Sequence, residues 1–220
     1  MPSISHFFDT LINSKGLFLE AMLWTLKLTV VSILIGIVFG LFFALLKISR
    51  VKVFGYISDI YVFLVRGTPL IVQIFILYFG FSGLFLIPDF WAAALALAFH
   101  NGAYIAEIFR GTIQSIDKGQ MEAGRSLGMT RGLAMRRIIL PQAFKRALPP
   151  LGNQFIIGLK DSSLAAFISM NELFNVATTL GSNNFDEMTY LLIVAVYYLV
   201  LVALLTIVVS LVEKRLAVSE

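Results

Sequence analysis

The chain has 220 residues, of which 59% are hydrophobic and only 14% are charged, and its net charge is +4. A soluble domain usually has about 25% charged residues, so this composition excludes an ordinary water-soluble protein and indicates that most of the chain lies in lipid. The absence of cysteine excludes disulfide bonds and thiolate metal sites.

Five apolar segments are long enough to cross a bilayer, which takes about 20 residues. They are residues 22–46, 68–86, 88–109, 150–170 and 188–212. The fourth begins at Pro149-Pro150, and Gly36 and Gly40 in the first are predicted to form a helix-packing face. The sequence therefore predicts an all-α membrane protein, with residues 1–220 as a single domain.

The predicted start of the second segment depends on where the charged residue Arg66 can lie. Arg66 at mid-bilayer would cost at least ~2.5 kcal/mol, whereas Thr68-Pro69 is a polar N-cap followed by proline at the first helical position. We therefore expect the span to begin at Thr68. Residues 53–66 are then predicted to form a short helix that lies at the membrane interface.

The positions of Lys and Arg predict the orientation, because cytoplasmic loops are enriched in them. Most of the 17 lie in three regions: residues 47–66, residues 110–147 and the C-terminal tail. These regions fall on one side of a five-span chain, and the other side offers Lys15 alone. We predict that the N-terminus is outside and the C-terminus is cytoplasmic.

The predicted cytoplasmic loop, residues 110–147, contains an ordered pattern of acidic, small and apolar residues. The pattern consists of Glu122, Ala123, Gly124, Gly128, Ile138, Leu140 and Pro141. It resembles the Glu-Ala-Ala loop of the permease subunits of ATP-binding-cassette (ABC) importers of type I, and it departs from the family at Gly124, where alanine is usual. The resemblance implies that a short helix of this loop docks onto an ATPase subunit.

Further segments are similar to the polar amino-acid uptake branch of these permeases, which takes up arginine, histidine or glutamine. They are residues 66–70, 106–111, 119–123 and 159–164. The resemblance implies five spans and a bacterial cytoplasmic-membrane location. It also implies two copies of a cytoplasmic ATPase, a second permease that is identical or a close paralogue, and a substrate-binding protein outside the membrane.

No enzymatic site is expected in the chain itself. The phosphate-binding pattern Gly, four residues, Gly-Lys-Ser/Thr is absent, so ATP and Mg²⁺ are expected on the partner ATPase and no cofactor on this chain. No catalytic residue or metal-ligand set stands out, and the expected partners are protein subunits, amino acid and lipid, with no nucleic acid.

Polar residues inside the apolar segments are candidates for the substrate pathway, because ionisable groups are costly there. His100, Tyr104 and Glu107 share one face of the third segment at helical spacing, and Asn101 flanks them. The other candidates are Thr68, Asp161, Ser162 and Ser163. Two acids facing a cavity would suit arginine, lysine or protonated histidine.

Each of these residues also has a structural interpretation. Asp161 could pair with Lys160, Glu107 could pair with Arg110, and His100 could be a hydrogen-bond donor between helices. A permease for glutamine, an ion-coupled transporter that uses Glu107 and Asp161 as a proton relay, and a membrane scaffold remain alternatives at this point.

Overall fold

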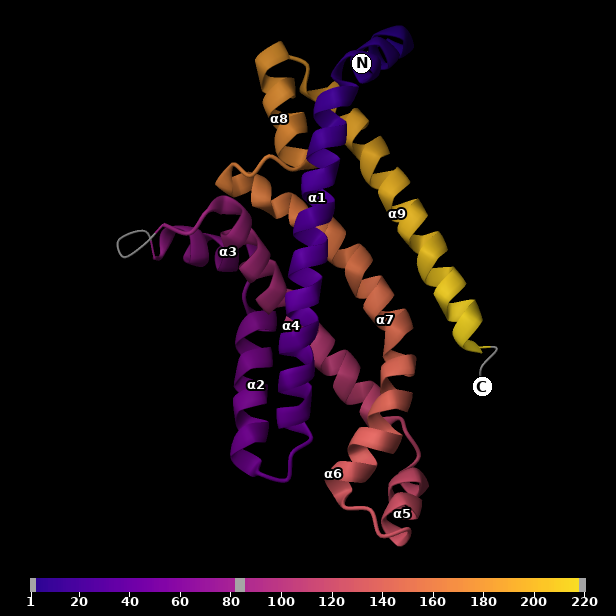
Figure 1. Ribbon diagram of the computed structural model, residues 1–220. Helices are drawn as coiled ribbons and strands as arrows, with labels where there is room; N and C mark the ends of the chain where they lie inside the picture. The colour runs from indigo at the N-terminus through magenta and orange to yellow at the C-terminus, as the bar shows by residue number, and fades with distance from the viewer. Residues whose placement is uncertain (1–2, 82–85, 218–220) are drawn as a thin grey trace.

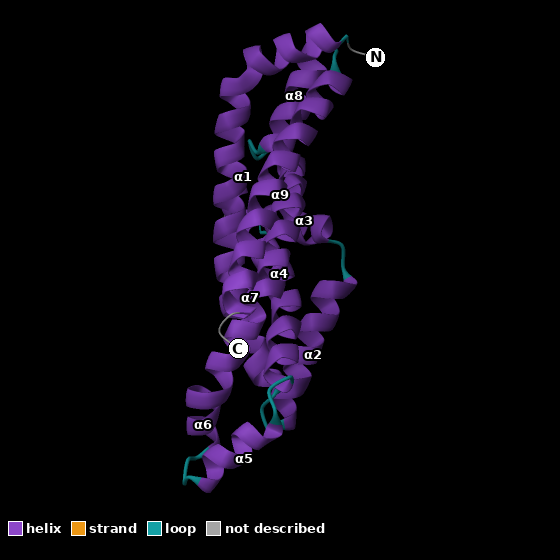
Figure 2. Cartoon of the chain, turned by 90° about the vertical axis from the view of Figure 1, so that its right-hand side faces the viewer, coloured by secondary structure: helices purple, strands orange, loops and turns teal. Residues whose placement is uncertain are grey.

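The computed structural model describes residues 3–81 and 86–217, and every regular element within them is helical (Figures 1 and 2). In chain order these are α1 (Ile4–Lys47), α2 (Lys52–Gly67), α3 (Leu70–Phe79), α4 (Asp89–Gln114), α5 (Lys118–Ser126), α6 (Arg131–Ala134), a π-helical turn (Met135–Ile139), α7 (Leu140–Asp161), a 3₁₀ segment (Ser162–Ile168), α8 (Leu173–Asn184) and α9 (Glu187–Ala217). The all-α prediction is confirmed.

Helices α1 and α4 form the centre of the bundle. The Ser3 hydroxyl caps α1 by accepting a hydrogen bond from the His6 amide, and the helix continues for 44 residues. At about 1.5 Å per residue it is longer than a bilayer is thick. Helix α4 is lined with small buried residues, mostly alanine, so neighbouring backbones approach it closely.

The predicted glycine face of α1 is confirmed as the contact with α4. A Cβ atom on Gly40 would lie 2.5 Å from Ile105 Cγ2, and one on Gly36 would lie 3.2 Å from the Ala98 carbonyl oxygen. No larger residue fits either position without displacing α4.

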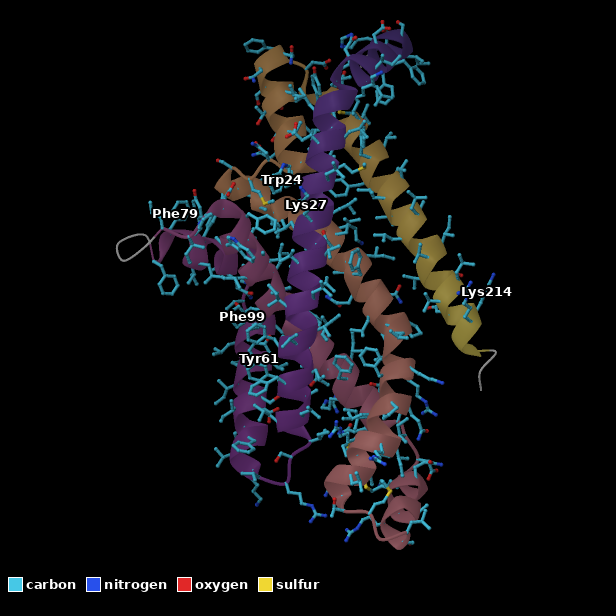
Figure 3. The ribbon with its side chains drawn as sticks, viewed as in Figure 1. Trp24, Lys27, Tyr61, Phe79, Phe99 and Lys214 are labelled. Carbon is cyan, nitrogen blue, oxygen red and sulfur yellow. The ribbon has the colours of Figure 1, made fainter. Side chains whose placement is uncertain are left out.

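A helix over residues 53–66 and a break before the second segment are both present, because α2 ends at Gly67 and α3 begins at Leu70. The predicted place of the first helix at the membrane interface stays a prediction. Helix α2 packs alongside the lower half of α1 instead of lying across the end of the bundle (Figure 1). The Tyr61 hydroxyl of α2 donates a hydrogen bond of 2.7 Å to the carbonyl oxygen of Phe99 of α4, and both residues are labelled in Figure 3. Helix α3 then leaves α2 at an angle of 100° and ends at Phe79; residues 82–85 of the predicted span lie outside the described residues.

The bend follows directly after Arg66, the charged residue from which the start of the second segment was predicted. Arg66 lies in the last turn of α2 and is exposed, so its charge is not buried in the chain. At the break, the Thr68 hydroxyl donates to the Leu64 carbonyl, and the Gln73 amide donates to the carbonyls of Val65 and Thr68. Side chains therefore satisfy the carbonyls that the end of α2 leaves free.

The predicted fourth segment, residues 150–170, also has different limits. Pro149 and Pro150 lie inside α7, which begins at Leu140 and ends at Asp161. Two adjacent prolines leave the carbonyls of Lys145 and Arg146 without helical donors. Both residues are exposed, so water can hydrate these carbonyls and the helix continues.

Helix α8 lies at the end of the bundle that also holds the N-terminus, and α9 forms a hairpin with it and runs from there along α7, whereas α5 and α6 lie at the opposite end (Figures 1 and 2). His6 and Asp186 form a hydrogen bond of 2.7 Å that ties the N-terminus to this hairpin. Hydrogen bonds from His6 and Thr189 lower the pKa of the Asp186 carboxyl group.

Within the described residues, three helices are long and apolar enough to cross a membrane: α1, α4 and α9. The number is four if α2 and α3 form one bent span. The predicted count of five and the predicted orientation stay predictions.

Candidate functional site

The predicted docking loop is folded into α5, α6 and the π-helical turn. The Asp117 side chain accepts a hydrogen bond of 2.6 Å from the Gly119 amide at the start of α5. The helix ends at Gly128, whose φ of +83° is a left-handed conformation that glycine adopts without strain. These two signals limit α5 to nine residues.

One side of α5 has no partner within the described chain. Glu122 and Ala123 are exposed, and Leu127 at the tip is 84% exposed. The outer side of α5 therefore presents an acidic group and an apolar group that the described chain does not cover.

The other side of the loop packs on the bundle. Gly124 is buried, and a Cβ atom on it would lie 2.8 Å from Ile138 Cδ1. The end of the isoleucine side chain occupies this space, so an alanine at position 124 would require that side chain to move. Ile138 thus holds α5 in place.

An apolar cluster connects this loop to three longer helices. It contains Ile113 of α4, Ile139 of the π-helical turn and Ala143 of α7, with Leu140 and Ile48 packed against them. Pro141, the last residue of the pattern, is exposed in the first turn of α7. A force on α5 therefore reaches α4 and α7 through packed side chains.

The structure brings His100 and Tyr104 together on α4, with ring centroids 5.3 Å apart. Glu107 lies one turn further on, but its carboxylate accepts three hydrogen bonds from Arg110, the shortest at 2.7 Å. The pairing of Glu107 with Arg110 is thus confirmed. The buried Nδ1 atom of His100 has no hydrogen-bond partner in the described chain.

The sequence analysis missed Arg66 as a member of this face. Its guanidinium lies 4.9 Å from the centroid of the Tyr104 ring. We expected Arg66 at the membrane interface. Its contact with α4 depends on the bend between α2 and α3, so no local sequence pattern could predict it.

Asn101 does not join this face. It is fully buried, donates to the Leu97 carbonyl and accepts a hydrogen bond of 2.7 Å from the Gln154 amide of α7. This buried pair fixes α7 against α4. The structure therefore shows a packing contact for Asn101, and its place on the substrate pathway stays a prediction.

Asp161 lies at the point where α7 changes into the 3₁₀ segment. It is half-buried, and no ion pair joins it to Lys160 in the described chain. The hydroxyls of Ser162 and Ser163 donate to the carbonyls of Leu159 and Lys160, each at 2.7 Å. The predicted break in the helix is therefore present at these residues, and the Asp161 carboxylate is left available.

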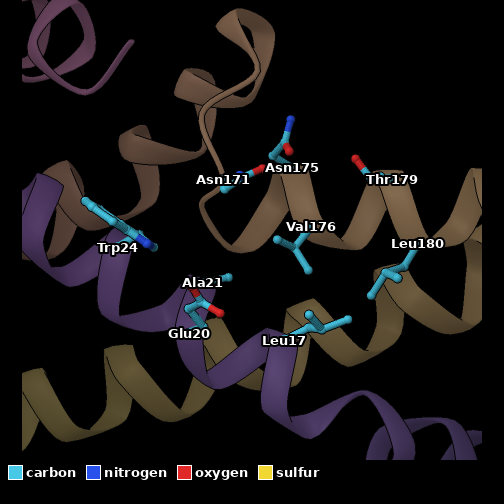
Figure 4. Close-up of a pocket in the computed structure, with 9 residues that line it drawn as sticks. All are labelled: Leu17, Glu20, Ala21, Trp24, Asn171, Asn175, Val176, Thr179 and Leu180. Carbon is cyan, nitrogen blue, oxygen red and sulfur yellow. The ribbon is translucent and has the colours of Figure 1, made fainter. Parts of the chain in front are cut away.

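A groove with a volume of about 260 Å³ lies between α1 and α8 (Figure 4). Ala21 and Val176 line it with apolar groups, and Glu20, Asn175 and Thr179 contribute polar groups. It lies at the end of the bundle away from α5 (Figure 1). Among the described residues, no three His, Asp or Glu side chains are grouped closely enough to hold a metal ion.

The helical bundle and its folded polar loop define a membrane protein of the transport class. Residues 36–218 match the family described as "Binding-protein-dependent transport system inner membrane component", and the chain belongs to this family. Its fold is that of a type I ABC importer permease.

Known members resemble the chain over nearly its whole length. The arginine transport system permease protein ArtQ of Bacillus subtilis is 39% identical over 97% of this chain and 98% of its own length. The glutamine transport system permease protein GlnP of Escherichia coli K12 is 36% identical over 92% of this chain and 94% of its own. A crystal structure of an amino acid ABC transporter with histidines is 39% identical, covers 98% of this chain and 100% of that chain, and has a TM-score of 0.89.

Proposed function

We propose that this chain is the membrane subunit of an ATP-driven importer that carries basic amino acids, namely arginine, lysine and histidine. The main support is the loop: Glu122, Ala123 and Leu127 are exposed on α5, while the opposite side of α5 is packed against the bundle. Such a loop can bind a separate ATPase and transmit its movement. The similarity to ArtQ supports an amino acid as cargo.

The partners follow from this assignment. Two copies of a cytoplasmic ATPase bind the α5 loops of this chain and of a second permease, and a binding protein delivers the amino acid from outside. Closure of the ATPases moves α4 and α7 through the apolar cluster at Ile113 and Ile139. This is rigid-body switching between two arrangements of packed helices.

The pathway is proposed to pass the Asp161 carboxylate. A cationic side chain would find there an acid that feels the charge of Lys160 but forms no direct ion pair within the described chain. Glu107 is less suited to bind cargo because Arg110 already neutralises it. For the same reason a proton relay through Glu107 and Asp161 is disfavoured.

Glutamine is the second candidate cargo, because GlnP is 36% identical to this chain. The test is to isolate the whole transporter through an affinity tag on this chain, reconstitute it in liposomes and measure ATP-dependent uptake of radiolabelled arginine with unlabelled competitors. Competition by lysine and histidine supports basic cargo. Stronger competition by glutamine overturns that assignment, and the absence of a co-purified ATPase overturns the importer.

A further inference from the structure

An unpaired cation lies on the face of α4 that carries His100 and Tyr104. The Arg66 guanidinium is 4.9 Å from the centroid of the Tyr104 ring, and Arg66 forms no hydrogen bond or ion pair with any described residue. Glu107, the acid on the same face, already accepts three hydrogen bonds from Arg110. Arg66 is exposed, so its guanidinium is open to a ligand from outside the chain.

The chemistry of this group fits a carboxylate. An unpaired charge is costly in hydrocarbon, so a guanidinium within a membrane protein needs water or an anion beside it. It donates through a planar fork that matches the two oxygens of a carboxylate, and stacking on an aromatic ring holds that plane in place. The Tyr104 hydroxyl has no hydrogen-bond partner in the described chain either, so a second donor is free at the same place.

Helices α4 and α7 are antiparallel, and their contact places Tyr104 and Asp161 on one side of the pair (Figure 1). A Cβ atom on Gly158 would lie 3.3 Å from the Asn101 amide nitrogen, so these two residues mark the contact. Tyr104 follows Asn101 by three residues, and Asp161 follows Gly158 by three. Each step turns by about 300°, and because the helices run in opposite directions both turns lead to the same side. The two residues are then roughly 9 Å apart along the helix axes.

Arginine and lysine carry an α-carboxylate at one end and a cationic group at the other, and an extended molecule bridges such a separation. We propose that Arg66 binds the α-carboxylate of the cargo while Asp161 receives its cationic side chain. The guanidinium donates two hydrogen bonds to the carboxylate oxygens, with the Tyr104 ring against its face. Arg66 thereby distinguishes an amino acid from a simple amine. The inference rests on the proposed function and adds a specificity-determining residue to it.

Agmatine, which is arginine without its carboxylate, separates the two contacts. The test measures equilibrium binding of radiolabelled arginine and of agmatine to the whole purified membrane complex, without the external binding protein, so that only the membrane site is measured. The wild type is expected to bind arginine more tightly than agmatine. Arg66→Gln is expected to weaken arginine binding about tenfold or more, because charge-assisted hydrogen bonds are lost, and to leave agmatine binding unchanged.

Arg50→Gln is the matched control, because it removes another exposed arginine, from the turn before α2. It is expected to bind both ligands as the wild type does. Equal weakening of arginine and agmatine in Arg66→Gln would overturn the inference, since the contact with Tyr104 would then only hold α2 against α4. An undiminished preference of this variant for arginine would overturn it as well.

Asp161→Asn distinguishes this inference from the proposed function. It is expected to weaken the binding of both ligands, because both carry the guanidinium group. Unchanged binding of both would overturn the proposed pathway past Asp161, whatever Arg66→Gln shows. A wild-type complex that binds neither ligand would overturn the transport of basic amino acids and the role of Arg66 together.

Discussion

At the scale of single residues, the Asp161 carboxylate differs from the other acid of the predicted pathway because it has no ion-pair partner in the described chain. Asp161→Asn is therefore expected to lower arginine uptake about tenfold, since a charge-assisted contact is lost, and to leave glutamine uptake nearly unchanged. Uptake of both amino acids by the same liposomes measures this. An equal loss for both would indicate that Asp161 supports the helix break and does not contact the cargo.

Glu122 is the residue through which the docking surface is tested. Its exposed charge lies on the outer side of α5. Glu122→Lys is expected to reduce ATP-dependent uptake more than tenfold, because reversing a charge at an interface repels a complementary partner. Association is measured by the amount of ATPase that co-purifies with the tagged chain.

The control for this prediction is Glu213→Lys, the same change at an exposed position in the last turns of α9. It leaves the loop intact and is expected to keep uptake and ATPase binding. If both variants behave alike, net charge and not docking accounts for the effect of Glu122→Lys.

At the scale of helices, the contact between α1 and α4 depends on glycine at one position. Gly40→Ala is expected to destabilise the chain by about 1–3 kcal/mol, because its Cβ would overlap Ile105. Gly16→Ala on the same helix has nothing within 4 Å and is expected to stabilise it by up to about 1 kcal/mol. Thermal unfolding in detergent compares the two. A fall in stability for both would mean that α1 has a different partner.

The helices differ in how far the sequence could predict them. Segment 188–212 is uninterrupted and apolar, and α9 covers it fully. Pro149-Pro150 misled the prediction, and the contact of Arg66 was missed, because both were judged by local rules. Arg66 is exposed beside the bend after Gly67, and α7 continues through the two prolines, before which Lys145 and Arg146 are exposed. Tertiary contacts decided both cases.

The same limit holds for the candidate site. The Glu-Ala loop has a fixed spacing, so the sequence alone could predict a role for Glu122, Gly128 and Ile138. Contacts between distant helices have no such signal: Gln154 to Asn101 and Tyr198 to Glu172 join residues 53 and 26 positions apart. The contact of Asn101 with α7 could not be predicted, because the sequence analysis considered only the helix of Asn101 itself.

At the scale of the whole molecule, Glu172 predicts a pH dependence of stability. Its folded pKa of about 7 lies above its ordinary value of 4.5, so the folded chain binds more protons between these values. Its contribution to stability is therefore complete below pH ~4.5 and is lost as the pH rises through ~7, a change of up to roughly 3 kcal/mol. The groups that contact its buried carboxylate are the amides of Phe174 and Asn175 and the phenol of Tyr198, which ordinarily titrates near pH ~10.

Thermal unfolding in detergent at pH ~5.5 and ~8 measures this dependence. Glu172→Gln cannot ionise and is expected to show a smaller decrease between the two pH values than the wild type. Asp186 does not interfere, because its pKa is lowered and its contribution is lost only in stronger acid. Equal decreases in the variant and the wild type would show that another group titrates.

The topology of the whole chain is open to a direct test, because the protein has no cysteine. Five spans result if α2 with α3 counts as one bent span and α7 with the 3₁₀ segment as another. Ser182 of α8 is then outside, and Ser126 of α5 is cytoplasmic. Both serines are exposed, so a single cysteine introduced at either position can react. A membrane-impermeant maleimide added to intact cells is expected to label position 182. Position 126 is expected to be labelled only after lysis. Labelling of both in intact cells, or of position 126 alone, would contradict the proposed orientation.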